Sequence, residues 1–164
     1  MTKPHTLIFD TGPLWELILY AAVHELGYAR RNAELQFLRS QEQYRNLAGF
    51  IAQFRHRMTT PHVIAEIGSR ILRDFKSGRK DVWGLVYAEF TKMGMDEKTL
   101  QLLLMPEDIV VSIGVVDVSL LKIASGMEPG TSTVLSIDSE LIAECKRASL
   151  QAQHLWEVVA AELP

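Results

Sequence analysis

Short, mostly apolar runs alternate along this chain with longer segments in which apolar residues recur at helical spacing. The runs at 6–10, 109–111 and 133–137 are the clearest strand candidates, and weaker ones lie at 57–59 and 155–159. Strands without regular polar alternation are buried on both faces, which is typical of a parallel sheet covered by helices. We therefore predict an α/β fold with three layers, α/β/α, and a central parallel sheet of about four to five short strands.

Start and stop signals divide the rest of the chain into helices. Thr60 and Pro61 give the most definite start, because Thr is a good N-cap and Pro has no N–H to satisfy at the first helical position. Another helix is predicted to begin at Pro13 and end near Gly27, and a short one to begin with Asp96 as its cap. The remaining predicted helices cover 33–55, 82–90, 116–124 and 139–148.

A length of 164 residues corresponds to one domain. Hydrophobic residues make up 48% of the chain and charged residues 23%, so a single core can form without disulfides or metal. The sequence contains no clear repeat, linker or low-complexity segment. We predict a single domain over 1–164, with helical insertions around 28–57 and 76–108.

The charge balance and the single cysteine limit the partners and the compartment. The net charge is −3, whereas a protein that holds nucleic acid tightly through its phosphates is usually basic, so a nucleic acid would be a transient substrate. Cys145 alone excludes an intrachain disulfide and a Cys-cluster metal site, and it fits a reducing compartment. No apolar run approaches the ~20 residues that span a bilayer, and the N-terminus lacks a secretory pattern. We expect a cytoplasmic protein with no membrane segment.

Four acidic residues carry the chemical signal. Asp10 and Asp138 each follow a predicted strand, and ligands of open parallel sheets bind beyond the carboxyl ends of the strands. Glu66 and Asp117 interrupt apolar helix faces, where an acid is costly unless it is paired or bound to a metal. Without a His or Cys ligand pattern, such a set of acids favours a hard cation with oxygen ligands, Mg²⁺ or Mn²⁺.

Each acid also has a structural interpretation. Asp10 or Asp138 alone is more often a helix N-cap than a ligand. Asp117 is favoured at a helix start by the helix dipole, and Glu66 can pair with Arg70 four residues later. The order and setting of all four acids together are harder to explain by structure alone.

Four segments that contain these acids resemble the PIN-domain family of metal-dependent ribonucleases, which includes the VapC-type toxins. The segments are LIFDTGPL at 7–14, TPHVIAEI at 60–67, VDVSLLKIA at 116–124 and VLSID at 134–138. The resemblance implies that Asp10, Glu66, Asp117 and Asp138 are the catalytic acids and hold Mg²⁺ or Mn²⁺, with Thr11 and Ser136 beside them. Glu140 lies where some relatives have a further acid.

The resemblance implies an endoribonuclease in which water activated by the metal attacks an RNA phosphodiester. It also implies that the chain is the toxin of a toxin–antitoxin pair, which a small antitoxin protein would block. The alternative is a catalytically inactive PIN-like binding or scaffold module. A haloacid dehalogenase-type phosphatase would need a second Asp where Gly12 stands, and a receiver domain would need paired acids near the N-terminus.

An acidic pocket must still attract an anionic substrate. Arg70 is the best candidate for a phosphate contact, because it lies on the same helix face as Glu66. Other basic residues are predicted to lie on solvated helix faces: Arg30, Arg31, Arg55, Arg57, Arg73, Arg79 and Lys80. Trp83, Val86 and Phe90 recur at helical spacing and are expected in the core, with a homodimer face as the alternative.

Overall fold

The computed structural model describes residues 6–97 and 114–161, and it contains a parallel sheet of five strands. The strand order is β3-β2-β1-β4-β5. The strands are β1 (Thr6–Phe9), β2 (His56–Thr59), β3 (Met95–Glu97), β4 (Ser132–Ser136) and β5 (Gln151–His154). Helices cover both faces of the sheet, so the predicted three-layer α/β fold is confirmed.

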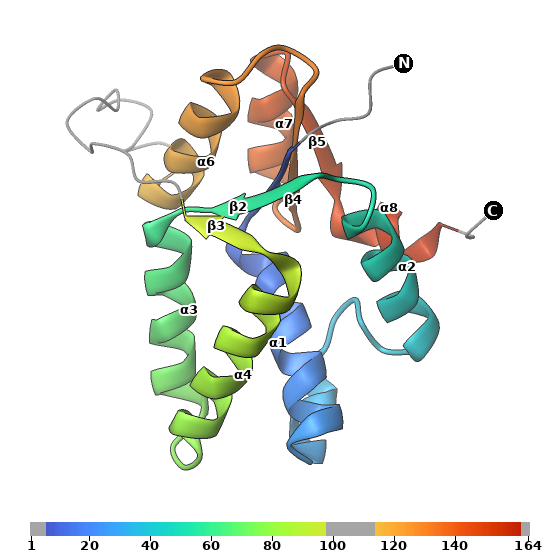
Figure 1. Cartoon of the computed structure of the whole chain (residues 1–164), viewed down its shortest axis with the longest axis vertical. Helices are drawn as coiled ribbons and strands as arrows, with labels where there is room; N and C mark the ends of the chain where they lie inside the picture. Colours follow the sequence, from blue (N-terminus) through green and yellow to red (C-terminus); the bar gives the residue numbers. More distant parts are fainter. Residues whose placement is uncertain (1–5, 98–113, 162–164) are drawn as a thin grey trace.

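The connections that run from β1 through β2 to β3 place most of their helices on one face of the sheet. The described helices of the connections that run back to β4 and on to β5 lie on the other face. Figure 1 shows α1 (Thr11–Glu25), α3 (Pro61–Asp74) and α4 (Arg79–Met93) below the sheet, and α6 (Val115–Ser125) and α7 (Ser139–Arg147) above it. The helices α2 (Gln41–Ile51) and α8 (Leu155–Ala160) pack against each other at one side. In the described ranges, none of the helices is both long and apolar enough to cross a bilayer.

Strand β1 lies at the centre of the sheet, with β2 on one side and β4 on the other. Leu7, Ile8 and Phe9 are completely buried, as expected for a strand covered on both faces. The chain leaves β1 into α1 below the sheet and leaves β4 into α7 above it. The strand order therefore reverses between β1 and β4, and their carboxyl ends border the crevice in which such sheets bind ligands.

The predicted helix over 33–55 is wrong for its first part. The short 3₁₀ helix η1 (Ala29–Glu34) is followed by a nonhelical stretch, and α2 begins only after its N-cap Ser40. Ser40 forms a capping box with Gln43, which defines the start of α2 sharply. The nonhelical stretch curves around Glu16, whose carboxylate accepts the backbone N–H groups of residues 36, 37 and 38 at 2.9, 3.0 and 3.0 Å.

The predicted strand over 155–159 is also wrong, because these residues form α8 and the strand β5 lies just before them. Leu155, Val158 and Val159 are buried on one face of the helix, and this spacing matches a helical stripe. Strand β5 is polar because it lies at the edge of the sheet and pairs with β4 alone. Asp96 lies in β3, and the predicted helix after it and the predicted strand 109–111 fall outside the described residues.

Replacement of Glu16 by Ala should destabilise the fold. Glu16 is 4% exposed, so the change removes the acceptor of three backbone N–H groups, of which that of Leu38 is buried, and lowers the free energy of unfolding by about 1–3 kcal/mol. Urea denaturation measures this loss. Glu25→Ala, at the exposed end of the same helix, is the control and should stay within about 0.5 kcal/mol of wild type. An unchanged urea midpoint for Glu16→Ala would contradict this role.

Gly12→Ala should destabilise the protein, whereas Gly84→Ala should stabilise it. A Cβ atom at Gly12 would lie 2.4 Å from Ile137 Cγ1, so the Ile137 side chain or the start of α1 must shift, at a cost of about 1–3 kcal/mol. A Cβ at Gly84 meets nothing within 4 Å, and Ala in a helix is more favourable than Gly by up to about 1 kcal/mol. Thermal melts of the two variants should therefore shift in opposite directions.

Candidate functional site

Asp10 follows β1 and is the N-cap of α1. It is 6% exposed, and its two carboxylate oxygens accept hydrogen bonds from the Thr11 backbone N–H and the Ser136 hydroxyl, both at 2.6 Å. Burial raises the pKa of Asp10, while these two hydrogen bonds oppose the shift. The charges of Glu66 and Asp138 add to the rise. Asp10 is therefore a buried acid that lies near two of the other predicted site residues.

Asp138 lies beside Asp10 because Ser136 connects them. The Ser136 hydroxyl donates to Asp10 and accepts the backbone N–H of Asp138 at 2.8 Å. Asp138 is in turn the N-cap of α7, and its Oδ1 accepts the N–H groups of Glu140 and Leu141 at 2.7 and 3.3 Å. Both aspartates are therefore helix caps, as the structural interpretation proposed, and they also lie together at the carboxyl edge of the sheet.

Glu66 extends from the second turn of α3 toward the start of α1. Its Oε2 accepts the Thr11 hydroxyl at 2.9 Å, and its Oε1 pairs with Arg70 Nη2 at 2.9 Å. The guanidinium carbon of Arg70 lies 5.8 Å from the centre of the Trp15 ring. Thr11 thus connects Glu66 to the same helix start that Asp10 caps.

Asp117 enters the group from the first turn of α6. Burial, first, and then the charges of the other acids raise its pKa from 3.8 to about 7. The contributing acids are Asp10, Asp138, Glu66 and Glu140. The Ser119 hydroxyl in α6 contacts the Thr60 hydroxyl at the start of α3 at 3.0 Å, which holds the two helix starts together. All four predicted acids therefore act on one another electrostatically at a single edge of the sheet.

The donor set suits a hard cation, although several of its oxygens already have partners within the chain. Carboxylates that repel one another bind a divalent ion well, because the ion removes the repulsion. In the two described ranges, however, no group of three or more His, Cys, Asp or Glu side chains is arranged as metal ligands. Asp10, Glu66 and Asp138 instead accept hydrogen bonds from neighbouring groups.

Most of the predicted basic candidates have partners away from this edge. Arg73 pairs with Asp74, and Arg79 donates to the carbonyl groups of residues 72 and 75. Arg31 pairs with Glu34 and lies over the Phe75 ring. Within the described part of the chain, Arg70 is the one basic residue with an ion pair to a predicted site acid.

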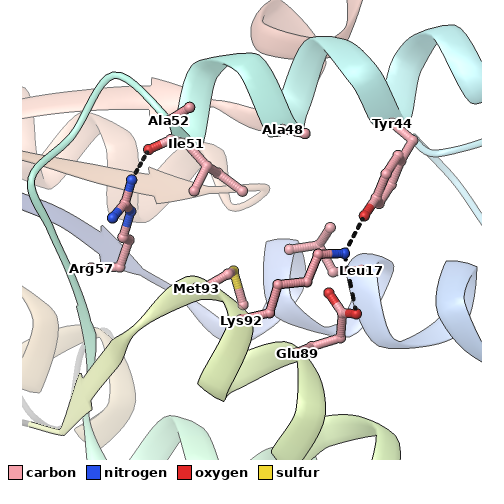
Figure 2. Close-up of a pocket in the computed structure, with 9 residues that line it drawn as sticks. All are labelled: Leu17, Tyr44, Ala48, Ile51, Ala52, Arg57, Glu89, Lys92 and Met93. Atoms are coloured by element: carbon pink, nitrogen blue, oxygen red, sulfur yellow. Dashed lines mark hydrogen bonds and ion pairs between the residues drawn. The ribbon is translucent and has the colours of Figure 1, made fainter.

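The sequence reasoning missed a pocket of about 210 Å³ between α1, α2 and α4. Figure 2 shows Lys92 at its centre, with its ammonium 3.3 Å from the Tyr44 hydroxyl and 3.7 Å from Glu89. Burial raises the pKa of Glu89, and the charge of Lys92 opposes the shift. The sequence does contain a pattern that could have indicated this pair: Glu89 lies between the apolar Val86 and Phe90, and a lysine follows three residues later. The three side chains satisfy one another and join α4 to α2.

Cys145 is completely buried, as predicted for a core residue. Burial, and then the charges of Asp117 and Asp10, raise its pKa to about 11. The thiol therefore stays protonated and unreactive at neutral pH, and it lies close enough to Asp117 and Asp10 for their charges to raise its pKa.

No protein-family model matches this chain, and no curated protein matches it. A function must therefore be argued from the side chains at the edge of the sheet.

Asp117→Asn should stabilise the metal-free protein at pH 8 but not at pH 4. Because the folded-state pKa of about 7 lies above the ordinary 3.8, stability from this group is fully present below pH 3.8 and is lost as the pH rises through 7. Solvent screening at this half-buried position limits the gain at pH 8 to about 1–2 kcal/mol, or about 2–8 °C. Thermal melts in EDTA at both pH values measure it.

Asp81→Asn is the matched control, because Asp81 occupies the first turn of α4 as Asp117 occupies that of α6. Asp81 is exposed, so its replacement should lose a small favourable interaction with the helix dipole, about 0.3–1 kcal/mol, at pH 8. A lower melting temperature for Asp117→Asn at pH 8 would make Asp117 a structural residue instead.

Proposed function

We propose that this chain is a metal-dependent endoribonuclease of the PIN-domain type, in which Asp10, Glu66, Asp117 and Asp138 bind Mg²⁺ or Mn²⁺. The observation that carries the proposal is the convergence of four acids from four separate elements, whose mutual repulsion contributes to the pKa of about 7 at Asp117. Stability alone does not favour such a group, because like charges that share a site destabilise the fold. A site that binds a cation accounts for it.

The position of the acids supports the proposal. They lie where the strand order reverses between β1 and β4, which is the usual ligand site of an open parallel sheet. The four segments that resemble PIN domains are the ones that bring the acids to this edge. The single cysteine cannot form an intrachain disulfide, which is compatible with the reducing cytoplasm in which we place the protein.

Each side chain has a part in the proposed hydrolysis. Ser136 keeps Asp10 and Asp138 adjacent, and Thr11 keeps Glu66 turned toward them. A bound divalent cation would lower the pKa of an attacking water and stabilise charge on the phosphodiester. Water forms a new P–O bond as the opposite P–O bond breaks, and the departing oxygen takes up a proton. Arg70 pairs with Glu66 and is the residue that we propose for contact with a substrate phosphate.

Two protein partners belong to the proposal. A small antitoxin that covers the acids would restrain the activity if the chain is the toxin of a pair. A second copy would fit the apolar surface of α3 and α4, where Leu72, Trp83 and Tyr87 are exposed. Val86, which the sequence placed on the same stripe, is buried in the core.

The alternative function is a catalytically inactive PIN-like scaffold. One observation favours it: Asp10, Glu66 and Asp138 already accept hydrogen bonds within the chain, and Arg70 partly neutralises Glu66. A scaffold would keep these contacts for stability and would not bind divalent ions.

Cleavage of a mixed panel of single-stranded and structured RNAs tests the proposal. Wild type with Mg²⁺ or Mn²⁺ should cut, EDTA should abolish cutting, and Asp117→Asn should reduce the rate by about 100-fold or more, because it removes a negative ligand. Asp81→Asn is the control and should cut like wild type. Metal-dependent cutting that survives in Asp117→Asn would contradict the assigned site. A folded wild type that neither cuts nor binds Mn²⁺ would favour the scaffold.

A further inference from the structure

The ion pair between Glu66 and Arg70 lies within the proposed metal site. Glu66 Oε1 is 2.9 Å from Arg70 Nη2, and its other oxygen accepts the Thr11 hydroxyl. Both oxygens of this predicted ligand are therefore engaged, one of them by a positive charge. A divalent cation at Glu66 would lie next to the guanidinium, and the two like charges would repel each other.

The aromatic ring under Arg70 holds the guanidinium from its other side. Trp15 is only 7% exposed and packs edge-on against Phe75, with ring centres 6.2 Å apart. The Arg70 guanidinium carbon lies 5.8 Å from the Trp15 ring centre, within the range of a cation–π contact. Arg70 thus has a second contact, with the buried Trp15 ring, that does not depend on Glu66.

We infer that Arg70 is the resident counter-ion of the metal-free site, and that it gives up Glu66 when a divalent cation binds. The inference rests on the proposed function. Arg70 neutralises part of the acidic group while no metal is bound, and it keeps Glu66 oriented. When the metal takes over Glu66, the guanidinium remains on the Trp15 ring with its donors free for a phosphate oxygen.

The exposure of the pair makes such an exchange inexpensive. The Arg70 and Glu66 side chains are 29% and 37% exposed, and ion pairs of this kind on helices are weak. The pair is therefore strong enough to orient Glu66 and too weak to exclude a divalent ion.

Removal of Arg70 should therefore tighten metal binding while it weakens RNA binding. Free Mn²⁺, measured by its paramagnetic resonance signal, reports the metal affinity directly and without catalysis. Arg70→Gln should bind Mn²⁺ about two- to fivefold more tightly than wild type, since the competing ion pair is gone. Arg73→Gln, one turn further along the same helix and paired with Asp74, should leave the affinity unchanged. Arg70→Lys keeps the charge and should stay close to wild type.

The second measurement uses a short oligoribonucleotide with Mn²⁺ in the Asp117→Asn background, where cutting is blocked. Adding Arg70→Gln to this background should weaken binding of the oligoribonucleotide by about two- to fivefold. This change is opposite in direction to the tighter Mn²⁺ binding expected for Arg70→Gln with Asp117 intact. Weaker or unchanged Mn²⁺ binding by Arg70→Gln, in a wild type that binds Mn²⁺ and cuts, overturns the exchange and leaves the proposed function standing. A wild type that neither binds Mn²⁺ nor cuts overturns both.

Discussion

The pairing of β1 with β4 is the constraint on which the candidate site depends. These strands are distant in sequence, and their register places Phe9 opposite Leu135, so the next residues along each strand come out at the same edge. The Asp10 backbone N–H continues the ladder to the Leu135 carbonyl at 3.1 Å, and the Ser136 hydroxyl then joins Asp10 to the start of α7. A slip of one residue would turn Ser136 to the opposite face and separate the two aspartates.

The rest of the fold is arranged to tolerate the acids that this pairing brings together. Asp10 and Asp138 are stabilised as helix caps, where the helix dipoles and backbone N–H groups favour a negative charge. Glu66 is stabilised by Thr11 and Arg70. Asp117 is half-buried and is repelled by the other acids, and burial first and then this repulsion raise its pKa to about 7. A group of like charges that destabilises the fold persists only where the surrounding structure compensates for it.

The sequence predicted those features whose causes are local. Thr60 and Pro61 specify the start of α3 from their own chemistry, and Asp10 and Asp138 follow strands that are apolar enough to be recognised alone. The nonhelical stretch before α2 was missed because its cause is remote: Glu16, about twenty residues earlier, binds its backbone. The helix α8 was mistaken for a strand because β5, a polar edge strand, carries no apolar signal of its own. The Glu66–Arg70 pair and the two helix caps follow from local spacing, whereas the contacts of Thr11 with Glu66 and of Ser136 with Asp10 join distant segments and were expected only from the resemblance.

The hydrogen-bond and ion-pair partners of each buried or half-buried acid indicate whether that acid has a structural role or is available for chemistry. Glu16, Glu89, Glu66 and Asp117 all lie on helices among apolar residues, so the sequence pattern alone does not distinguish them. Glu16 is satisfied by three backbone N–H groups, and Glu89 by Lys92, a neighbour on its own helix. Asp117, in contrast, faces other acids, and neutral donors within the chain cannot remove that repulsion. Either a proton on Asp117 or a bound cation relieves it, and the positive charge of Arg70 acts mainly at Glu66. The repulsion that remains at Asp117 is the physical reason to expect a cation at this edge of the sheet and not at the pocket around Lys92.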